Sequence, residues 1–170
     1  MRLLVTSLAL LALAGCATQG QDPDNNLVHC KRATDAEVAS LFERWNNALR
    51  TRNPQTVVAL YSSDSLLLPT LSNQPRATVE EKLDYFRYFL QGSPTGSIDR
   101  RHVIVDCNTA VDTGLYTFRF ANGSSAKARY TYTYRWDGKQ WLITSHHSSA
   151  LPEAVSAQPK ASGSVRKNPK

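Results

Sequence analysis

The sequence has no apolar run long enough to cross a membrane, no C-x-x-C pair and no internal repeat. Its longest apolar stretch, Leu3–Leu13, falls short of the about 20 residues that a spanning helix needs. Without a C-x-x-C pair, thiol redox chemistry of the thioredoxin kind is not indicated. The 170 residues, of which 41% are hydrophobic, suffice for one domain with a packed core and tails.

The chain is basic, with a formal charge of +6 at pH 7. A basic balance can indicate contact with nucleic acid or with a membrane surface. Part of the excess, however, lies near the two ends, in Arg2, Arg166, Lys167 and Lys170, and the other charges are interspersed. We therefore expect ordinary solubility from this charge and no nucleic-acid partner.

The N-terminus has the layout of a secretory signal peptide. A charged start at Arg2 precedes the apolar run and small residues follow it, so residues 1–15 are expected to be removed on export. The end of the run, Leu-Ala-Gly-Cys, resembles the lipobox of bacterial lipoproteins, in which the cysteine, here Cys16, becomes the lipidated first residue. The alternative is a plain signal peptide with a coincidental cysteine.

Lipidation would anchor the protein to the cell envelope, because each buried methylene of an acyl chain contributes about 0.8 kcal/mol. Ala17 follows the cysteine. By resemblance to lipoproteins of Gram-negative bacteria, the absence of Asp at that position favours the outer membrane. The expected location is therefore the periplasmic face of the outer membrane, provided that the source is Gram-negative.

One domain is expected between two polar segments. Residues 16–30 comprise the lipidated cysteine and a flexible tether. Residues 154–170 form a basic tail, rich in Ser, Lys, Pro and Ala, that we expect to be disordered. The domain therefore spans residues 31–153.

Two cysteines remain after lipidation, Cys30 and Cys107. In an exported protein an even pair suggests a disulfide. It would close a long loop and stabilise the fold by about 4–5 kcal/mol in the chain-entropy estimate, often less in practice. The alternatives are two free thiols or a metal site.

Two capping boxes mark helix starts in the domain. Thr34–Glu37 precedes apolar residues at helical spacing and predicts a helix over residues 35–51. Thr78–Glu81 predicts a second helix that runs to about residue 91 and is closed by Gly92.

Shorter elements are expected between these helices. Pro54 suits the first turn of a short apolar helix that includes Val57, Val58 and Tyr61. The leucines of residues 65–70 then predict a short strand that ends near a proline.

The period of the hydrophobic pattern changes to two in the second half of the domain. Strands are expected at residues 101–107, 115–120, 126–136 and 140–149. Asn122-Gly123 and Asp137-Gly138 are strong hairpin signals. This order predicts an α+β domain, a cone-shaped fold with N-terminal helices packed on a curved antiparallel sheet.

Three stretches, in this order, resemble elements of the nuclear transport factor two-like (SnoaL-like) superfamily. Leu41–Leu49 is similar to its first helix, and Tyr61–Thr70 to its element of a Tyr, polar residues and an apolar strand. Asp137–Ser149 is similar to its final hairpin. Over residues 33–153 the likeness is closest to bacterial stand-alone association-domain proteins of the calcium/calmodulin-dependent protein kinase II type.

The resemblance implies a pocket between sheet and helices and a homodimer or larger homo-oligomer formed through the sheet. It does not imply kinase activity, because the sequence has none of the kinase motifs: no Gly-rich loop, no Val-Ala-Ile-Lys strand, no His-Arg-Asp loop and no Asp-Phe-Gly. Nor does it imply calmodulin binding, which belongs to a separate segment of the kinase.

Two adjacent histidines, His146 and His147, lie in the last predicted strand and must point to opposite faces. In the family's final hairpin a Trp is followed six residues on by His and eight on by Ser, here Trp141, His147 and Ser149. This pattern favours His147 as the pocket residue, where it could act as an acid or base near neutral pH. The alternative is a hydrogen-bonded structural histidine.

Four further residues are candidates for the ligand pocket. Pocket arginines are a feature of the kinase association domain, and Arg129 could grip a carboxylate; the alternative is a solvated sheet face. Arg76 follows a proline and could approach the mouth of the pocket. Tyr61 and Tyr85 could line the pocket, although either could equally be a core residue.

No metal or cofactor is expected, because no set of ligands has a recognisable spacing. No catalytic residue can be assigned either: an isomerase of the ketosteroid type needs a buried base carboxylate, and none of Asp64, Asp106 and Asp112 aligns with that base. Three functions stay open. The first is an envelope-anchored pocket domain that binds a small molecule, the second an isomerase or hydro-lyase acting on a small apolar carboxylate, and the third a docking module for another envelope protein.

Overall fold

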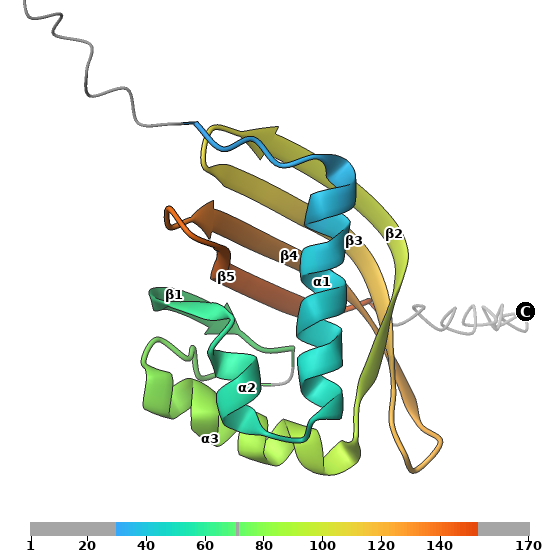
Figure 1. The fold of residues 1–170 in the computed structure, drawn as a ribbon. Helices are drawn as coiled ribbons and strands as arrows, with labels where there is room; N and C mark the ends of the chain where they lie inside the picture. The colour runs from blue at the N-terminus through green and yellow to red at the C-terminus, as the bar shows by residue number, and fades with distance from the viewer. Residues whose placement is uncertain (1–29, 71, 153–170) are drawn as a thin grey trace, which may run out of the picture.

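The structure, a computed structural model, describes residues 30–70 and 72–152. In it the helices lie against the concave face of a curved five-stranded sheet (Figure 1). The predicted α+β cone is therefore confirmed. No helix in this part of the chain is both long and apolar enough to cross a membrane. The predicted signal peptide, Cys16, most of the tether and the basic tail lie outside the described residues.

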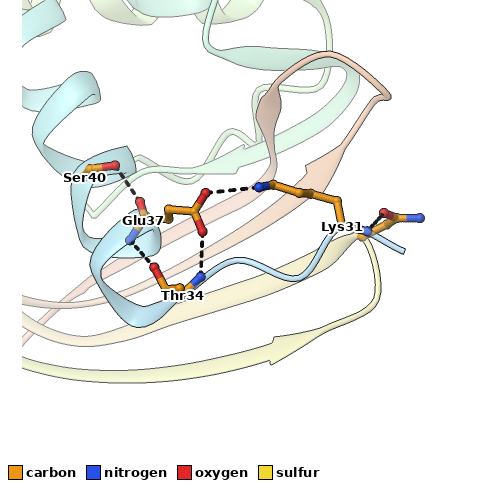
Figure 2. Close-up of polar contacts among 5 residues, drawn as sticks. Lys31, Thr34, Glu37 and Ser40 are labelled. Carbon is orange, nitrogen blue, oxygen red and sulfur yellow. Dashed lines mark hydrogen bonds and ion pairs between the residues drawn. The ribbon is translucent and has the colours of Figure 1, made fainter. Parts of the chain in front are cut away.

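Helix α1 (Asp35–Arg50) begins at the predicted capping box. The Thr34 hydroxyl accepts from the backbone N–H of Glu37 at 3.1 Å, and the Glu37 carboxylate accepts from the backbone N–H of Thr34 at 2.8 Å. Lys31 adds an ion pair to the same carboxylate (Figure 2). Because these bonds satisfy donors that the first helical turn leaves free, they fix the start of α1.

The segment after α1 differs from the prediction. Helix α2 (Pro54–Val58) ends before Tyr61, which instead opens strand β1 (Tyr61–Leu68). Strand β1 lies at the edge of the sheet, beside β5. Tyr61 is extended because it pairs with this distant strand, although its spacing from the preceding apolar residues predicted a helix.

Helix α3 (Val79–Phe89) continues into a 3-10 turn, Leu90–Gly92. The left-handed residue that ends this turn is Ser93, with φ 48°, so Gly92 is not the cap that the sequence predicted. Gly92 serves another purpose: a Cβ there would lie 2.9 Å from Cδ1 of Phe120. The glycine therefore lets the end of α3 approach the sheet closely.

The other strands form the predicted antiparallel meander. They are β2 (Thr95–Asp106), β3 (Thr109–Arg119), β4 (Ser125–Trp136) and β5 (Trp141–Ala150). The sheet order is β1-β5-β4-β3-β2, and β1 pairs with β5 in parallel. Strand β3 begins earlier than predicted, because a tight turn with Asn108 at φ 57° lets its pairing with β2 start at Thr109. Strand β2 also begins earlier than predicted, because its first residue, Thr95, pairs with Arg119 at the far end of β3.

The core is aromatic and lies between α1 and the sheet. Trp45 of α1 packs edge-to-face on Phe86 of α3 and on Tyr132 of β4, with ring centroids 6.4 and 5.6 Å apart. Tyr130 and Tyr134 flank Tyr132 on the same face of β4, and all three side chains are almost completely buried. This core holds the helices at the distance from the sheet that leaves room for the cavity described below.

A buried ion pair lies on the concave face of β2 and β3. The Asp112 side chain is fully buried and accepts two hydrogen bonds from Nε of Arg101, each 3.1 Å long. Tyr130 donates a third bond of 2.8 Å to the same carboxylate. Burial raises the pKa of Asp112, while the two partners act to lower it. The charge is therefore compensated inside the fold.

The start of the domain is fastened to the turn between β2 and β3. The backbone N–H of Lys31 donates to the Asn108 side chain at 2.8 Å, and the backbone N–H of Asn108 donates to the Lys31 carbonyl at 3.1 Å. Cys30 and Cys107 are exposed free thiols at this contact, and the neighbouring Cys30 thiol raises the pKa of Cys107. The predicted disulfide is not formed in the structure.

Candidate functional site

A cavity of about 640 Å³ lies between α3 and the concave face of the sheet. Its walls are largely aromatic: Trp45, Tyr85, Phe86, Phe89, Phe118 and Phe120. Phe89 of α3 meets Phe118 and Phe120 of the β3 end edge-to-face, at centroid distances of 5.5 and 6.2 Å. Such rings would cover an apolar ligand body well.

Three hydroxyl groups gather at the polar end of this cavity. Tyr116 donates to Oγ of Ser148 at 2.5 Å, and Ser148 is also hydrogen-bonded to Thr70. The three hydroxyls carry three protons, but they make only two hydrogen bonds with one another. One hydroxyl proton therefore makes no bond within the cluster.

His146 lines the cavity beside these hydroxyls. Its Nδ1 lies 2.9 Å from the hydroxyl of Tyr61, which in turn accepts a 3.0 Å bond from Nε1 of Trp45. Burial, helped by the neighbouring His147, lowers the pKa of His146 to about 3, so the ring is neutral at physiological pH. Its Nε2 is buried and has no partner among the described residues.

Arg76 brings a permanent positive charge to the cavity. Its backbone forms a short antiparallel bridge to Leu67 of β1, with hydrogen bonds of 2.8 and 3.1 Å. The guanidinium lies 3.5 Å from the hydroxyl of Ser72, and its Nε is buried without a partner within the described part of the chain. Arg76 therefore lines the cavity with a buried donor that has no acceptor in this part of the chain.

The structure distributes the predicted pocket residues between two faces of the sheet. Arg76 and Tyr85 line the cavity, and burial raises the pKa of Tyr85 to about 12. Tyr61 lies behind the wall and reaches the cavity through His146. Arg129 and His147 are exposed on the opposite face, where they border a shallow depression. The choice of His147 over His146 for the cavity is therefore corrected.

A bulge in β5 explains this correction. Trp141 and Ile143 face the core, and strict alternation would continue the inward set through His147 and Ser149. The register of β5 shifts between Ile143 and Ser145, against both of its neighbouring strands. One extra residue reverses the phase, so that His146 and Ser148 point inward instead.

Four residues at the polar end of the cavity were not predicted from the sequence as pocket residues: Thr70, Tyr116, His146 and Ser148. The phase of Tyr116 was available from the alternation in its strand, because Tyr116 and Phe118 share a face. Thr70 and Ser148, however, are 78 positions apart in the chain, and no local pattern brings them together.

The described residues do not bring together three His, Cys, Asp or Glu side chains in an arrangement that could hold a metal ion. The expectation that the protein uses neither metal nor cofactor stays a prediction.

Comparison with known proteins places this geometry in a family. The profile of the calcium/calmodulin-dependent protein kinase II association domain matches residues 34–152. A Xanthomonas campestris protein solved under the name of this association domain is 47% identical, with a TM-score of 0.69 over 72% of this chain and 91% of that one. No functionally curated protein matches the chain.

More distant structures share the fold. An NTF2-like protein of unknown function from Pseudomonas putida is 20% identical, with a TM-score of 0.62 over 73% of this chain and 90% of that one. The iota-carbonic anhydrase of a cyanobacterium, solved with bicarbonate, is also 20% identical, with a TM-score of 0.62 over 72% of this chain and 94% of that one. At these identities the likeness concerns the fold alone.

Proposed function

Because the chain belongs to the calcium/calmodulin-dependent protein kinase II association domain family, we propose that it is a self-associating domain whose cavity binds a small carboxylate. The carboxylate would occupy the polar end, near Ser148 and Arg76. An apolar body would lie against the aromatic walls.

A surplus of hydrogen-bond donors carries this proposal. The cluster of Thr70, Tyr116 and Ser148 has one proton more than it uses, and Nε of Arg76 has no partner among the described residues. A buried donor without an acceptor costs about 1–3 kcal/mol. An ionised carboxylate is an acceptor only and complements the guanidinium charge. It would therefore accept the spare hydroxyl proton and recover the cost of the buried Arg76 donor.

Calorimetric titration with benzoate tests the proposal. We expect the wild-type protein to bind benzoate, and Ser148→Ala to weaken binding about tenfold, since the loss of one charge-assisted bond is about 1.5 kcal/mol. Ser149→Ala removes the same hydroxyl from the opposite face of β5 and should bind like wild type. Benzylamine, with the same ring and a cation, should not bind. Equal binding of the two compounds, or equal weakening by the two variants, would refute the proposal.

A second candidate function is that of a hydro-lyase, the reversible hydration of carbon dioxide to bicarbonate and a proton. It is favoured by the hydroxyl chain, which links buried Tyr116 through Ser148 to the more accessible Thr70 and could carry a proton away from a bound water. His146, with a pKa of about 3, is not a base at neutral pH. A stopped-flow indicator assay, run with and without a chelator, should show hydration that Ser148→Ala abolishes and Ser149→Ala keeps. Wild-type protein with no activity would remove this candidate.

Self-association is proposed to use the outer face of the sheet. Ile104 of β2 is 55% exposed there, and Val111, Thr131 and Leu142 are only half-buried. Partly exposed Ile, Val, Leu and Thr side chains on one sheet face can pack against a second sheet. Native mass spectrometry should report two or more subunits, and Thr131→Arg at the centre of the face should yield monomers. A wild-type monomer would contradict the proposal.

The N-terminal anchor is the remaining part of the proposal. Lipidation at Cys16 would attach the exported protein to the envelope, on the periplasmic face of the outer membrane in a Gram-negative host. Metabolic labelling with palmitate should mark the wild-type protein and not Cys16→Ser. Label that persists in the variant would refute the lipobox interpretation.

A further inference from the structure

Tyr61 and Trp45 form a hydrogen-bonded chain that ends on the ring of His146. Both side chains are buried, as is the ring. Trp45 donates to Tyr61 at 3.0 Å, and Tyr61 lies 2.9 Å from Nδ1 of His146. The indole N–H is a donor only, so the direction of the first bond is fixed.

We infer that Tyr61 and Trp45 are positioning residues that keep the His146 proton on Nε2, so that His146 donates a hydrogen bond to the ligand. This inference rests on the proposed carboxylate pocket. It assigns His146 the role of a neutral donor beside the hydroxyl cluster, and not that of an acid or base.

A count of the protons on Trp45, Tyr61 and His146 supports placing the His146 proton on Nε2. Trp45, Tyr61 and a neutral His146 carry one exchangeable proton each, and two of them make the two observed bonds. If Tyr61 donates to Nδ1, the only proton left over is on Nε2. There it belongs to a residue that lines the cavity, where a ligand can accept it. In the opposite arrangement Nδ1 would donate to Tyr61, whose own proton would be buried behind the cavity wall with no acceptor among the described residues, at a cost of about 1–3 kcal/mol that a ligand could not recover.

The surroundings of His146 favour the neutral donor as well. The ring stacks on Tyr132 at a centroid distance of 4.1 Å and meets Trp45 edge-on at 5.3 Å. These contacts hold it between aromatic surfaces, where an imidazolium would be poorly solvated. With Nδ1 occupied, Nε2 is the ring nitrogen available to the cavity that His146 lines.

The site would then favour ligands that present hydrogen-bond acceptors. The hydroxyl cluster, Arg76 and His146 all line the cavity, and the described residues of its lining include no carboxylate. Carboxylate or carbonyl oxygens fit this arrangement. An ammonium group would be repelled by the Arg76 charge and could not accept from the His146 Nε2–H, which is why benzylamine is expected to fail.

Nitrogen NMR of ¹⁵N-histidine-labelled protein tests the inference directly, because ring correlations show which nitrogen bears the proton. The His146 signals are assigned by their loss in His146→Asn. In the wild type we expect a protonated Nε2 and a bare Nδ1 from pH 5 to pH 8, and a shift of the Nε2 proton when benzoate is added. Tyr61→Phe should mix the two tautomers and weaken benzoate binding about tenfold.

Tyr134→Phe is the matched control. It removes a hydroxyl from the same aromatic core, but the Tyr134 hydroxyl has no partner among the described residues, so tautomer and affinity should match the wild type. A wild type that binds benzoate with its proton on Nδ1 would overturn the inference and leave the carboxylate pocket intact. Absence of benzoate binding, with the proton on Nε2, would instead overturn the proposed function and with it the donor role of His146.

Discussion

Removing Arg101 should destabilise the fold because it leaves the charge of Asp112 buried and uncompensated. The Asp112 side chain is fully buried, whereas the Arg101 side chain is 24% exposed. Breaking one partner out of a buried pair costs about 3–5 kcal/mol. Since water can reach the Arg101 side, we expect Arg101→Met to cost about 3 kcal/mol at pH 7, at the lower end of that range.

The pH dependence of this loss has a defined sign. Burial raises the pKa of Asp112 above its ordinary value of 3.8 in the folded state. A folded acid with a raised pKa loses stability as the pH rises through the interval between the unfolded and folded values. Without Arg101 the folded pKa rises further, so the loss should be largest at neutral pH and shrink as the pH falls toward 4, where Asp112 is protonated.

Urea unfolding at pH 7 and pH 4.5 measures the effect. With an m value of about 1–3 kcal/mol/M, the midpoint should fall by about 1 M or more at pH 7. Arg135→Met is the matched control, because the pair of Arg135 with Asp64 has the same charges but is exposed, and such pairs contribute about 0–1 kcal/mol. Arg101→Met with Asp112→Asn should recover most of the loss. Equal losses in the two arginine variants, or a loss independent of pH, would refute the reasoning.

Three further predictions concern the Cys30–Cys107 pair, the cavity wall at Gly92 and the start of helix α1. Protein oxidised so that Cys30 and Cys107 form the disulfide predicted from the sequence should lose up to about 4–5 kcal/mol of stability on reduction, whereas a wild-type midpoint as insensitive to reductant as that of Cys107→Ser would contradict that prediction. Gly92→Ala should weaken benzoate binding while lowering unfolding stability by less than about 1.5 kcal/mol, because the new methyl group displaces the ring of Phe120 in the cavity wall; unchanged affinity would count against contact between the ligand and this part of the wall. Thr34→Ala should cost about 1 kcal/mol through the lost cap, but Ser40→Ala on the same helix should stay within about 0.5 kcal/mol.

The features that were predictable from the sequence are those decided by neighbouring residues. The capping boxes at Thr34 and Thr78 start α1 and α3 as expected, and the glycines of both hairpins adopt positive φ, 84° at Gly123 and 97° at Gly138. Each depends on a few consecutive residues and on bonds that close within one turn. Their order along the chain was enough to indicate the fold.

The site was less predictable because it depends on contacts between distant segments. Which of His146 and His147 faces the cavity depends on one extra residue in β5, at the shift of its register against β1 and β4. The alternation of residues in the β5 sequence does not show where this bulge lies. Arg76 was predicted as a cavity residue from its place in a loop after a proline, and it lines the cavity. The role of Tyr61 depends on a hydrogen bond to a residue 85 positions later.

The parallel pairing of β1 with β5 has a consequence for the order in which the protein assembles. The sheet partner of β1 is the last strand of the domain, and Leu67 is paired with His146. Contacts between such distant segments form slowly, since a long loop must close before they add stability. The hydrogen bonds of Thr70 with Ser148 and of Tyr61 with His146 can therefore form only after β5 has paired with β1. A chain still being synthesised from its N-terminus can complete its helices early, but it gains a binding site only when its final strand is in place.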